Sequence, residues 1–420
     1  YPHTNALVWG CIERIKFMPN NQLLIGGLSA NSLTKRFGTP LFVYDENIIR
    51  QRARTLRQSV TYPRTRLLYS CKSNTNPVIM KILRDEGFGI DAVSPGEIYF
   101  ALSIGFKPGE ISFTGNNCRT DELAYVVKQG VLFNADSLSQ LEKVGKIKPG
   151  LAISLRINPD VGDGHHEHVI TGGPDSKFGI WVYQLNQALK IAAKYRLKII
   201  GLHHHIGSGI LEPETFITAM EIMLKVAINF KGLEFINLGG GLGVAYSPGQ
   251  KRLDIKKFGR MVSERFSAFC RHYGKPLQLM LEPGRYPICE AGTLLATVTD
   301  IKETPEHTFV GTDSGFNHLI RHAFYNAYHE IVNASRLKGP KQFVAVCGNI
   351  CESGDMFTHG REITKFREGD IAAIRNAGAY GYSMAMQYNM RPKPAEVMVK
   401  GNKARLIRRR ESFKDLPGIR

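Results

Sequence analysis

The chain has 420 residues, of which 43% are hydrophobic and 22% are charged, so it is too long for one ordinary domain and fits one large barrel plus a second module. It contains no apolar run of about eighteen residues, which argues against a membrane partner. The net charge of +18 is spread along the chain, so we expect a basic solvated surface and no nucleic-acid partner.

The N-terminal segment, residues 1–37, precedes the repeated pattern that dominates the chain. It contains the apolar run Leu23-Leu24-Ile25, which has the composition of a short strand. Since both ends of the chain leave the repeated pattern, we expect this segment to pair with a C-terminal β domain.

From about residue 66 to residue 285 the sequence repeats a short apolar strand, a polar tip and an amphipathic helix. Helices are expected to begin at Asn76-Pro77 and at Thr120, which can act as a cap. This succession predicts a (β/α)8 barrel over residues 38–285. Longer helices are expected at 182–196, 214–230 and 255–272, and the eight strands at Arg66–Cys71, Gly89–Val93, Ile111–Thr114, Leu132–Ala135, Ala152–Ile157, Ile200–His204, Phe235–Leu238 and Gln278–Glu282.

Polar side chains follow the strands of this predicted barrel, where catalytic groups of such folds lie. Lys72, Arg156, His205 and Glu282 occupy strand ends, and a barrel with only a structural role would not need them together. The loop after the seventh strand, Gly239-Gly240-Gly241, lets backbone N–H groups approach an anion closely. Barrels of this type often hold a phosphate there.

The pattern changes after the barrel. Residues 286–420 alternate in short strands, at 343–346, 371–374 and 396–399, separated by glycine turns. The expected fold class is therefore α/β, with a TIM-like barrel followed by a mostly β C-terminal domain.

Each residue at the strand ends also has a plain structural interpretation. Lys72 could be solvated, Glu282 could be a surface carboxylate paired with an Arg, and the glycines could form a tight turn. Taken together, they favour a site in which Lys72 forms a Schiff base with an aldehyde cofactor and Glu282 keeps a pyridine nitrogen protonated. His205 would then be an aromatic plate against the cofactor ring, and Ser208 would donate to its phosphate.

Histidines and cysteines raise the question of a metal. His165, His166 and His168 lie in one glycine-rich loop, and the run His203–His205 ends a strand. Consecutive strand residues point to opposite faces, so the second group cannot converge on one ion, and we expect no metal at either. The seven cysteines form no paired Cys-x-x-Cys motif, which is typical of a reducing compartment and favours a cytoplasmic protein.

Cys351 lies beside an acid in a turn of the C-terminal domain, with Glu352 next to it and Gly348 and Gly354 on either side. A buried cysteine is most often a small hydrophobic residue. A cysteine flanked by an acid is also a candidate for proton transfer, and the residues alone leave both interpretations open.

Six stretches occur in one order from about residue 30 to the C-terminus. They are Tyr69-Ser70-Cys71-Lys72-Ser73-Asn74, His203-His204-His205-Ile206-Gly207-Ser208, Asn237-Leu238-Gly239-Gly240-Gly241-Leu242-Gly243, Glu282-Pro283-Gly284-Arg285, Cys351-Glu352-Ser353-Gly354-Asp355 and Gly378-Ala379-Tyr380. Each stretch is weakly specific, but the ordered set is highly specific. With these stretches the chain resembles the diaminopimelate decarboxylases over nearly its whole length.

The resemblance implies a pyridoxal 5'-phosphate enzyme that decarboxylates meso-2,6-diaminopimelate to L-lysine and CO2, the last step of lysine biosynthesis. It also implies a homodimer with shared active sites, in which Cys351 is the proton donor and reaches, with Glu352, into the other subunit's site. The cofactor-binding residues that it implies are Lys72, Arg156, His205, Ser208, Gly240, Gly241, Glu282, Gly284, Arg285 and Tyr380.

The choice of substrate rests on a narrower set of residues that the resemblance places at the substrate, Arg285, Arg321, Tyr325, Glu352 and Tyr380. Diaminopimelate carries a distal carboxylate, which the forked guanidinium of Arg321 suits, whereas an ornithine-type relative has an acidic residue there. A structural ion pair of Arg321 with Asp313 or Glu330 is the alternative. His322 and Asn349 stand where the family usually has proline, and Met386-Gln387 is also unusual, which affects fine substrate preference more than reaction type.

Three other functions compete with this interpretation. A decarboxylase for D-ornithine, D-lysine or a carboxylated polyamine would keep Lys72 and Cys351 but would not need Arg321. A racemase of this fold has an Arg at the pyridine nitrogen, and Glu282 argues against it. A non-catalytic relative would be expected to lose Lys72 or Cys351, and both are present.

Overall fold

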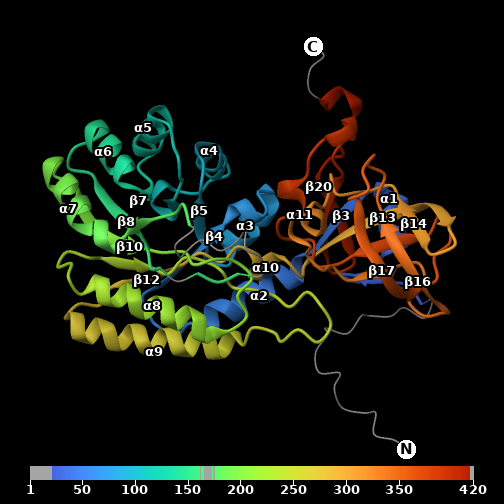
Figure 1. Cartoon of the computed structure of the whole chain (residues 1–420), viewed down its shortest axis with the longest axis horizontal. Coiled ribbons are helices and arrows are strands. Elements are labelled where there is room, and N and C mark those ends of the chain that lie inside the picture. The colour runs from blue at the N-terminus through green and yellow to red at the C-terminus, as the bar shows by residue number, and fades with distance from the viewer. Residues whose placement is uncertain (1–20, 161, 165–172, 174–175, 417–420) are drawn as a thin grey trace, which may run out of the picture. The chain divides into compact units, whose positions relative to one another are not determined.

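The computed structural model describes residues 21–160, 162–164, 173 and 176–416, which form two compact units (Figure 1). The barrel unit comprises residues 47–291 and 376–384. The sheet unit comprises the described part of Tyr1–Glu46 together with residues 292–375 and 385–420. The expected segment 1–37 therefore lies partly outside the described residues.

Eight parallel strands close into a barrel within the described part of the barrel unit. They follow one another in chain order, and the ring closes where β10 pairs with β8, Ile153 opposite Ile199 and Arg156 opposite His203. The predicted (β/α)8 barrel is thus confirmed. Its strands are β4 (Thr65–Ser70), β5 (Gly89–Ala92), β6 (Ile111–Phe113), β7 (Leu132–Ala135), β8 (Ala152–Asn158), β10 (Lys198–His203), β11 (Phe235–Asn237) and β12 (Gln278–Leu281), and β9 (Ile180–Trp181) extends β8.

Helices cover the outside of these strands, and α8 lies beside α9 along one flank (Figure 1). Asn76 caps α3 as expected, since its side chain accepts from the Val78 N–H at 3.0 Å. The expected cap at Thr120 was wrong by one residue: Arg119 is the N-cap, because its backbone N–H is held by Glu122 at 2.8 Å. The helices are α2 (Glu46–Ser59), α3 (Pro77–Asp85), α4 (Pro95–Ser103), α5 (Thr120–Gln129), α6 (Leu138–Ile147), α7 (Leu185–Lys194), α8 (Pro213–Ala227), α9 (Ile255–Tyr273) and the short α10 (Arg285–Ile288).

The sheet unit is mostly β, as predicted. Its main sheet has the strand order β17-β16-β14-β13-β3-β19-β20, and β18 pairs with both β13 and β15. The strands are β3 (Leu41–Asp45), β13 (Gly292–Glu303), β14 (Thr308–Thr312), β15 (Ile331–Asn333), β16 (Lys341–Cys347), β17 (Met356–Thr364), β18 (Ile371–Ile374), β19 (Ala395–Lys400) and β20 (Lys403–Arg408). They are joined by the two-stranded β1 (Leu24–Ile25) and β2 (Leu28–Ser29) and by the helices α1 (Ala30–Phe37) and α11 (Arg321–Tyr325).

The N-terminal strands and helix pack into the core of the sheet unit. Leu23 and Ile25 are buried in one cluster with Leu295 and Val397, and the Leu23 N–H donates to the carbonyl of Ala334 at 3.0 Å. Strand β3 also belongs to this unit, between β13 and β19, although the sequence placed the start of the barrel at residue 38. The side chains of β3 are buried on both faces of the strand. Its sequence therefore lacks the alternation of apolar and polar residues that would assign it to this sheet.

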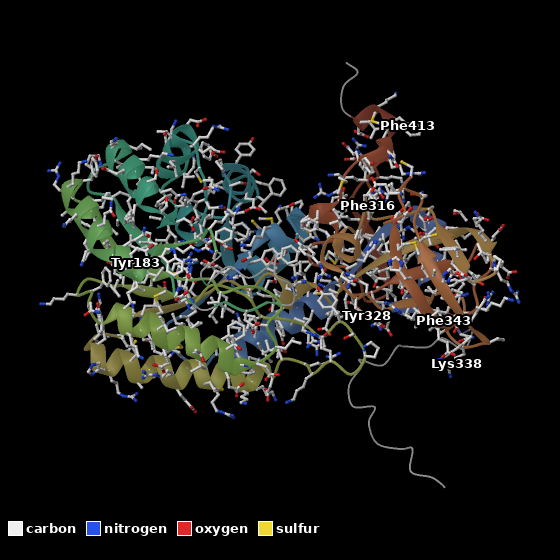
Figure 2. All side chains as sticks on the ribbon, viewed as in Figure 1. Tyr183, Phe316, Tyr328, Lys338, Phe343 and Phe413 are labelled. Carbon is white, nitrogen blue, oxygen red and sulfur yellow. The ribbon has the colours of Figure 1, made fainter. Side chains whose placement is uncertain are left out.

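Several large apolar side chains project from the surface of each unit. Tyr183 on the barrel unit and Phe343 and Phe413 on the sheet unit are exposed by 78%, 68% and 81% (Figure 2). They are single residues, which is usual for a protein surface. Among the described residues, no helix has the length and apolar character needed to cross a bilayer.

Candidate active site

Lys72 lies in a single helical turn, Cys71–Ser73, directly after β4. Its Nζ is 3.2 Å from Oδ2 of Asp91, and Ser70 donates to the same oxygen at 2.6 Å. Burial acts to lower the pKa of Lys72, but the charge of Asp91, supported by Tyr380, raises it above its usual value. About a third of the side chain, 34%, is exposed, so the amine is held in place and still accessible.

Glu282 follows β12 and is held from two neighbouring strands. Asn237 Nδ2 donates to its Oε1 at 2.6 Å, and His203 Nε2 lies 3.1 Å from its Oε2. Burial lowers the pKa of His203 to about 3, so its neutral ring donates through Nε2. Burial also raises the pKa of Glu282, while Lys72 and Asn237 act in the opposite direction. The result is a buried carboxylate with a donor at each oxygen.

His205 lies two residues beyond His203. The backbone N–H of Gly240 donates to its Nδ1 at 3.1 Å, which fixes the plane of the ring and leaves the proton on Nε2. Burial lowers the pKa of His205 well below its ordinary value. The ring is therefore neutral and held in a fixed plane.

Arg285 contacts three residues around the pocket. Its Nη2 donates to Ser208 Oγ at 2.9 Å and its Nη1 to the Tyr246 hydroxyl at 2.7 Å. The guanidinium also lies 4.9 Å from the centroid of the Tyr380 ring. Gly241 has φ +110°, a conformation that side chains other than glycine rarely adopt, and it brings the loop backbone to this place.

One pocket collects these groups in the barrel unit. It contains an amine, a buried carboxylate, an aromatic plate and a cation, which together fit an aldehyde cofactor with a basic ring and a phosphate. The predicted residues Arg156 and Gly240 are not among its lining residues. The pocket is lined by Ser70, Lys72, His205, Ser208, Gly241, Leu242, Glu282, Gly284, Arg285 and Tyr380.

Arg156 and Gly240 act on lining residues of the pocket, Arg156 through its charge on Glu282 and Gly240 through a hydrogen bond to His205. Arg156 Nη1 pairs with Asp136 Oδ1 at 2.9 Å, and its guanidinium lies 4.5 Å from the Phe178 ring centroid. Gly240 orients His205, and a Cβ at this position would clash with the carbonyl of Glu282. Gly284 lines the pocket itself, where a Cβ would contact Ser70 at 3.0 Å.

Cys351 and Glu352 belong to the sheet unit, in a loop organised by Asp355. The Asp355 carboxylate accepts from the N–H groups of Ile350 at 2.8 Å and Phe316 at 2.6 Å. Cys351 is exposed, which removes the interpretation of it as a buried hydrophobic residue within this unit. The carboxylate of Glu352 accepts from the Tyr388 hydroxyl at 2.6 Å.

Arg321 begins α11 in the sheet unit and its side chain is fully buried there. Its Nη1 lies 2.8 Å from His329 Nε2. Glu330, which the sequence offered as an alternative partner, pairs with Arg375 at 2.8 Å. The other alternative, Asp313, accepts from the Thr39 hydroxyl at 2.5 Å.

Two neighbours of Arg321 were also singled out from the sequence. Tyr325 ends α11, with its ring 4.8 Å from that of Phe324. The ring of His322 lies 4.6 Å from Phe357, and burial lowers the pKa of His322 to about 3, so this departure from the family pattern adds no charge.

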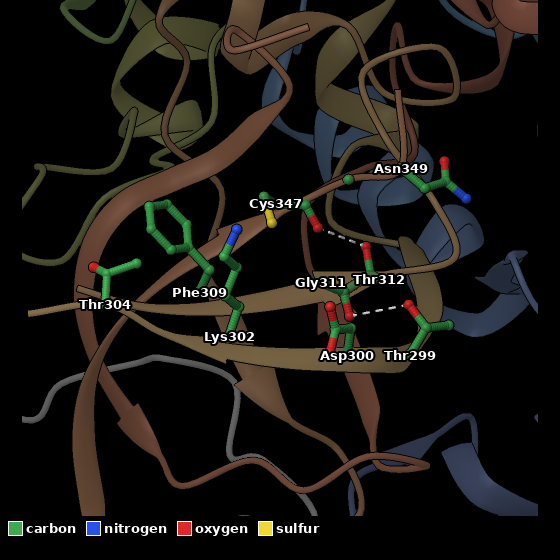
Figure 3. A pocket seen from close by; sticks show the side chains of 10 residues that line it. Thr299, Asp300, Lys302, Thr304, Phe309, Gly311, Thr312, Cys347 and Asn349 are labelled. Carbon is green, nitrogen blue, oxygen red and sulfur yellow. Dashed lines mark hydrogen bonds between the residues drawn. The ribbon is translucent and has the colours of Figure 1, made fainter. Parts of the chain in front are cut away.

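A second hollow lies on the sheet unit, over β13 and β14 and beside Cys347 and Asn349 (Figure 3). Thr299 and Thr312 direct their hydroxyls to the carbonyls of Gly311 and Cys347, at 3.4 and 3.1 Å. These hydroxyls are used within the sheet, so they connect strands rather than present groups to a ligand.

Four polar residues contact the site residues and were not assigned from the sequence. Asp91 holds Lys72, Asp136 holds Arg156, and His203 and Asn237 hold Glu282. The sequence could have indicated these contacts. A polar side chain that points into the barrel is shielded from solvent and therefore needs a hydrogen-bond partner within the protein. His203 is two residues before His205 and therefore faces the same side.

Metal ligation was not expected. Among the described residues there is no group of three or more His, Cys, Asp or Glu side chains that could hold an ion. His165, His166 and His168 lie outside the described residues.

Known proteins resemble this chain over nearly all of its length. The pyridoxal-binding domain of the pyridoxal-dependent decarboxylases matches residues 46–288. The diaminopimelate decarboxylase of Methanothermobacter thermautotrophicus is 46% identical over 415 residues, which cover 96% of this chain and 96% of that protein.

Solved structures agree with this similarity. The diaminopimelate decarboxylase of M. jannaschii superposes with a TM-score of 0.86 at 32% identity, covering 95% of this chain and 96% of that one. The Helicobacter pylori diaminopimelate decarboxylase, solved in complex with L-lysine, superposes with a TM-score of 0.84 at 31% identity and covers 92% and 97%.

Proposed function

The chain belongs to the diaminopimelate decarboxylases, a family of pyridoxal-dependent decarboxylases, and we propose that the barrel pocket around Lys72 is where it holds its cofactor and substrate. The enzyme removes CO2 from meso-2,6-diaminopimelate and releases L-lysine, which completes lysine biosynthesis. The observation that carries the proposal is the convergence of Lys72, Glu282 and the Ser208–Arg285 pair in one pocket.

Pyridoxal 5'-phosphate, when bound, supplies an electron-accepting ring for the two electrons that remain when the bond between Cα and the carboxylate breaks. Lys72 supplies the amine that anchors this cofactor, and Glu282 keeps a proton at the ring nitrogen. Ser208, Gly241 and Arg285 bind the phosphate, in keeping with the backbone approach and charge of their loop.

The remaining cofactor contacts follow from the same arrangement. His205, with its ring plane fixed by Gly240, would hold the cofactor ring by stacking against it. Arg156 is proposed to lie near the ring hydroxyl of the cofactor, as the family pattern implies. Tyr380 contacts both the cofactor and Arg285.

The distal end of the substrate needs a cation for its carboxylate and an acid for its ammonium. Arg321 and Arg285 are proposed for the carboxylate, because a guanidinium binds both oxygens. Glu352 is proposed for the ammonium, and Tyr325 and Tyr380 are proposed as further substrate-binding residues. Because relatives at 35–46% identity over nearly the whole chain are diaminopimelate decarboxylases, this substrate is favoured over D-ornithine, D-lysine or a carboxylated polyamine.

The proton that replaces the lost carboxylate is proposed to come from Cys351 or from Lys72 once it is free. We further propose a homodimer in which Cys351 and Glu352 complete the active site of the other subunit. A two-fold interface gives two equal sites of this kind. A cytoplasmic setting also remains a proposal, and it rests on the cysteine usage of the sequence.

The anchoring role of Lys72 is tested by chemical labelling. Borohydride reduction of the holoenzyme, followed by peptide mapping, should attach the cofactor to Lys72, and the Lys72→Ala protein should lose the absorbance of the lysine-bound cofactor. The solvent-exposed Lys128, replaced by Ala, is the matched control and should keep that absorbance. Label on another lysine would show that the pocket is assigned to the wrong cofactor chemistry.

A further inference from the structure

Polar residues at one level of the barrel surround Glu282. Arg156 on β8, His203 on β10 and Asn237 on β11 are register partners in turn, so their side chains leave the strands at the same height and toward the same side. All three are at least 95% buried, and Glu282 follows the next strand of the ring. Of these three residues, His203 and Asn237 contact the Glu282 carboxylate.

The contacts at this point are specific. Asn237 occupies Oε1 of Glu282 at 2.6 Å, and His203 faces Oε2 at 3.1 Å. Asn237 has a second task, because its Oδ1 accepts from the Gly239 N–H at 2.9 Å. That bond fixes which end of the amide faces Glu282, so the NH2 group has to be the donor.

We propose that His203 and Asn237 are positioning residues for Glu282: they fix its orientation and favour its ionised form so that it can hold the cofactor ring nitrogen protonated. The inference rests on the proposed function of Glu282 and deepens it. Hydrogen bonds to a carboxylate favour its charged form. Neither neutral donor cancels that charge, whereas a Lys or Arg in the same place would compete with the ring nitrogen for it.

The other charged groups around Glu282 do not replace these donors. Lys72 and Arg156 act on it through charge and favour the ionised form, whereas Asp91 repels it. Lys72 is paired with Asp91 and Arg156 with Asp136, so each cation has its own carboxylate. The contacts that fix the direction of the Glu282 oxygens are therefore those with His203 and Asn237.

Asn237→Leu and His203→Phe each remove one donor while keeping a similar shape. In the holoenzyme, each change should move the acidic limb of the pH profile of kcat, and of the cofactor absorbance, upward by about one pH unit, and should lower kcat about 10- to 100-fold. His203→Gln keeps a donor near the Nε2 position and should recover kcat to within about threefold of wild type.

A double-mutant cycle separates positioning from stability. If the donors act through Glu282, Asn237→Leu should lower kcat in the wild-type background and have little further effect on kcat beside Glu282→Gln. The matched control is Asn134→Leu, since Asn134 is fully buried in the same barrel but donates to Ser112 and Thr114. It should lower stability and leave the acidic limb in place.

The outcomes are distinguishable. If Glu282→Gln is strongly impaired but both donor-less variants keep the wild-type acidic limb, the positioning role is refuted and the function of Glu282 stands. If Glu282→Gln keeps the wild-type kcat, the proposed function of Glu282 itself fails. Should Asn237→Leu not fold, His203→Phe tests the same proposal from the other strand and the other oxygen.

Discussion

His204 should make the stability of the barrel depend on pH. It is 1% exposed, and among the described residues neither ring nitrogen has a hydrogen-bond partner. It lies beside a small, mostly apolar pocket that Phe216 and Phe258 also line. Burial lowers its pKa to about 3, so the folded protein holds a neutral ring.

The sign follows from proton uptake on unfolding. Below pH 6.5 the unfolded chain protonates His204 and the folded chain does not, so the free energy of unfolding falls as the pH decreases from about 6.5 toward the folded pKa. A pH of 5 lies about 1.5 units below the pKa of His204 in the unfolded chain. Proton uptake by His204 on unfolding therefore lowers the free energy of unfolding by about 2 kcal/mol at pH 5 relative to pH 7.5.

His204→Phe removes this proton uptake. In urea unfolding at saturating cofactor, we compare the free energy of unfolding of His204→Phe with that of wild type. The difference between the two proteins should favour the variant by about 2 kcal/mol more at pH 5 than at pH 7.5. His272→Phe, at an exposed position of α9, is the matched control and should give the same difference at both pH values. If the stability difference between His204→Phe and wild type is also the same at both pH values, His204 takes up no proton on unfolding. Burial would then not lower its pKa in the folded protein.

Three further predictions concern catalysis. Glu282→Gln should keep the cofactor bound but slow decarboxylation by several powers of ten, since each lost ~1.4 kcal/mol costs about tenfold, and an unchanged turnover number would contradict this. Arg321→Ala should lower kcat/KM for meso-diaminopimelate by about thirty- to several-thousand-fold, for about 2–5 kcal/mol, without a comparable loss on D-lysine. Parallel loss on both substrates, with lower thermal stability, would make Arg321 structural. Mixing inactive Lys72→Ala and Cys351→Ala proteins should restore up to about a quarter of the activity, and no recovery after verified subunit exchange would show that each chain completes its own site.

The barrel and most of its pocket could be predicted from the sequence because strand, tip and helix repeat at regular intervals. Lys72, His205 and Glu282 follow apolar strands directly, so a parallel barrel brings them to one rim. The pocket collects them as expected. Strand β3 could not be assigned in the same way, because its partners in the sheet, β13 and β19, are hundreds of residues away along the chain.

Side-chain partners were harder to predict than positions. The pairing of Asp91 with Lys72 and of Asp136 with Arg156 depends on the register of neighbouring strands, β4 with β5 and β7 with β8. The roles of His203 and Asn237 depend on register, since a shift by one residue would turn both side chains to the helix layer. His204 shows this alternation directly, because it lies beside the mostly apolar pocket while His203 faces Glu282.

The central claim is that this pocket converts meso-diaminopimelate to L-lysine. The most direct measurement is product identification after incubation of the purified protein with pyridoxal phosphate and meso-diaminopimelate. We predict one L-lysine and one CO2 for each substrate molecule consumed, and none from the Lys72→Ala protein. Release of a different amine, or L-lysine formed equally well without Lys72, would contradict the account.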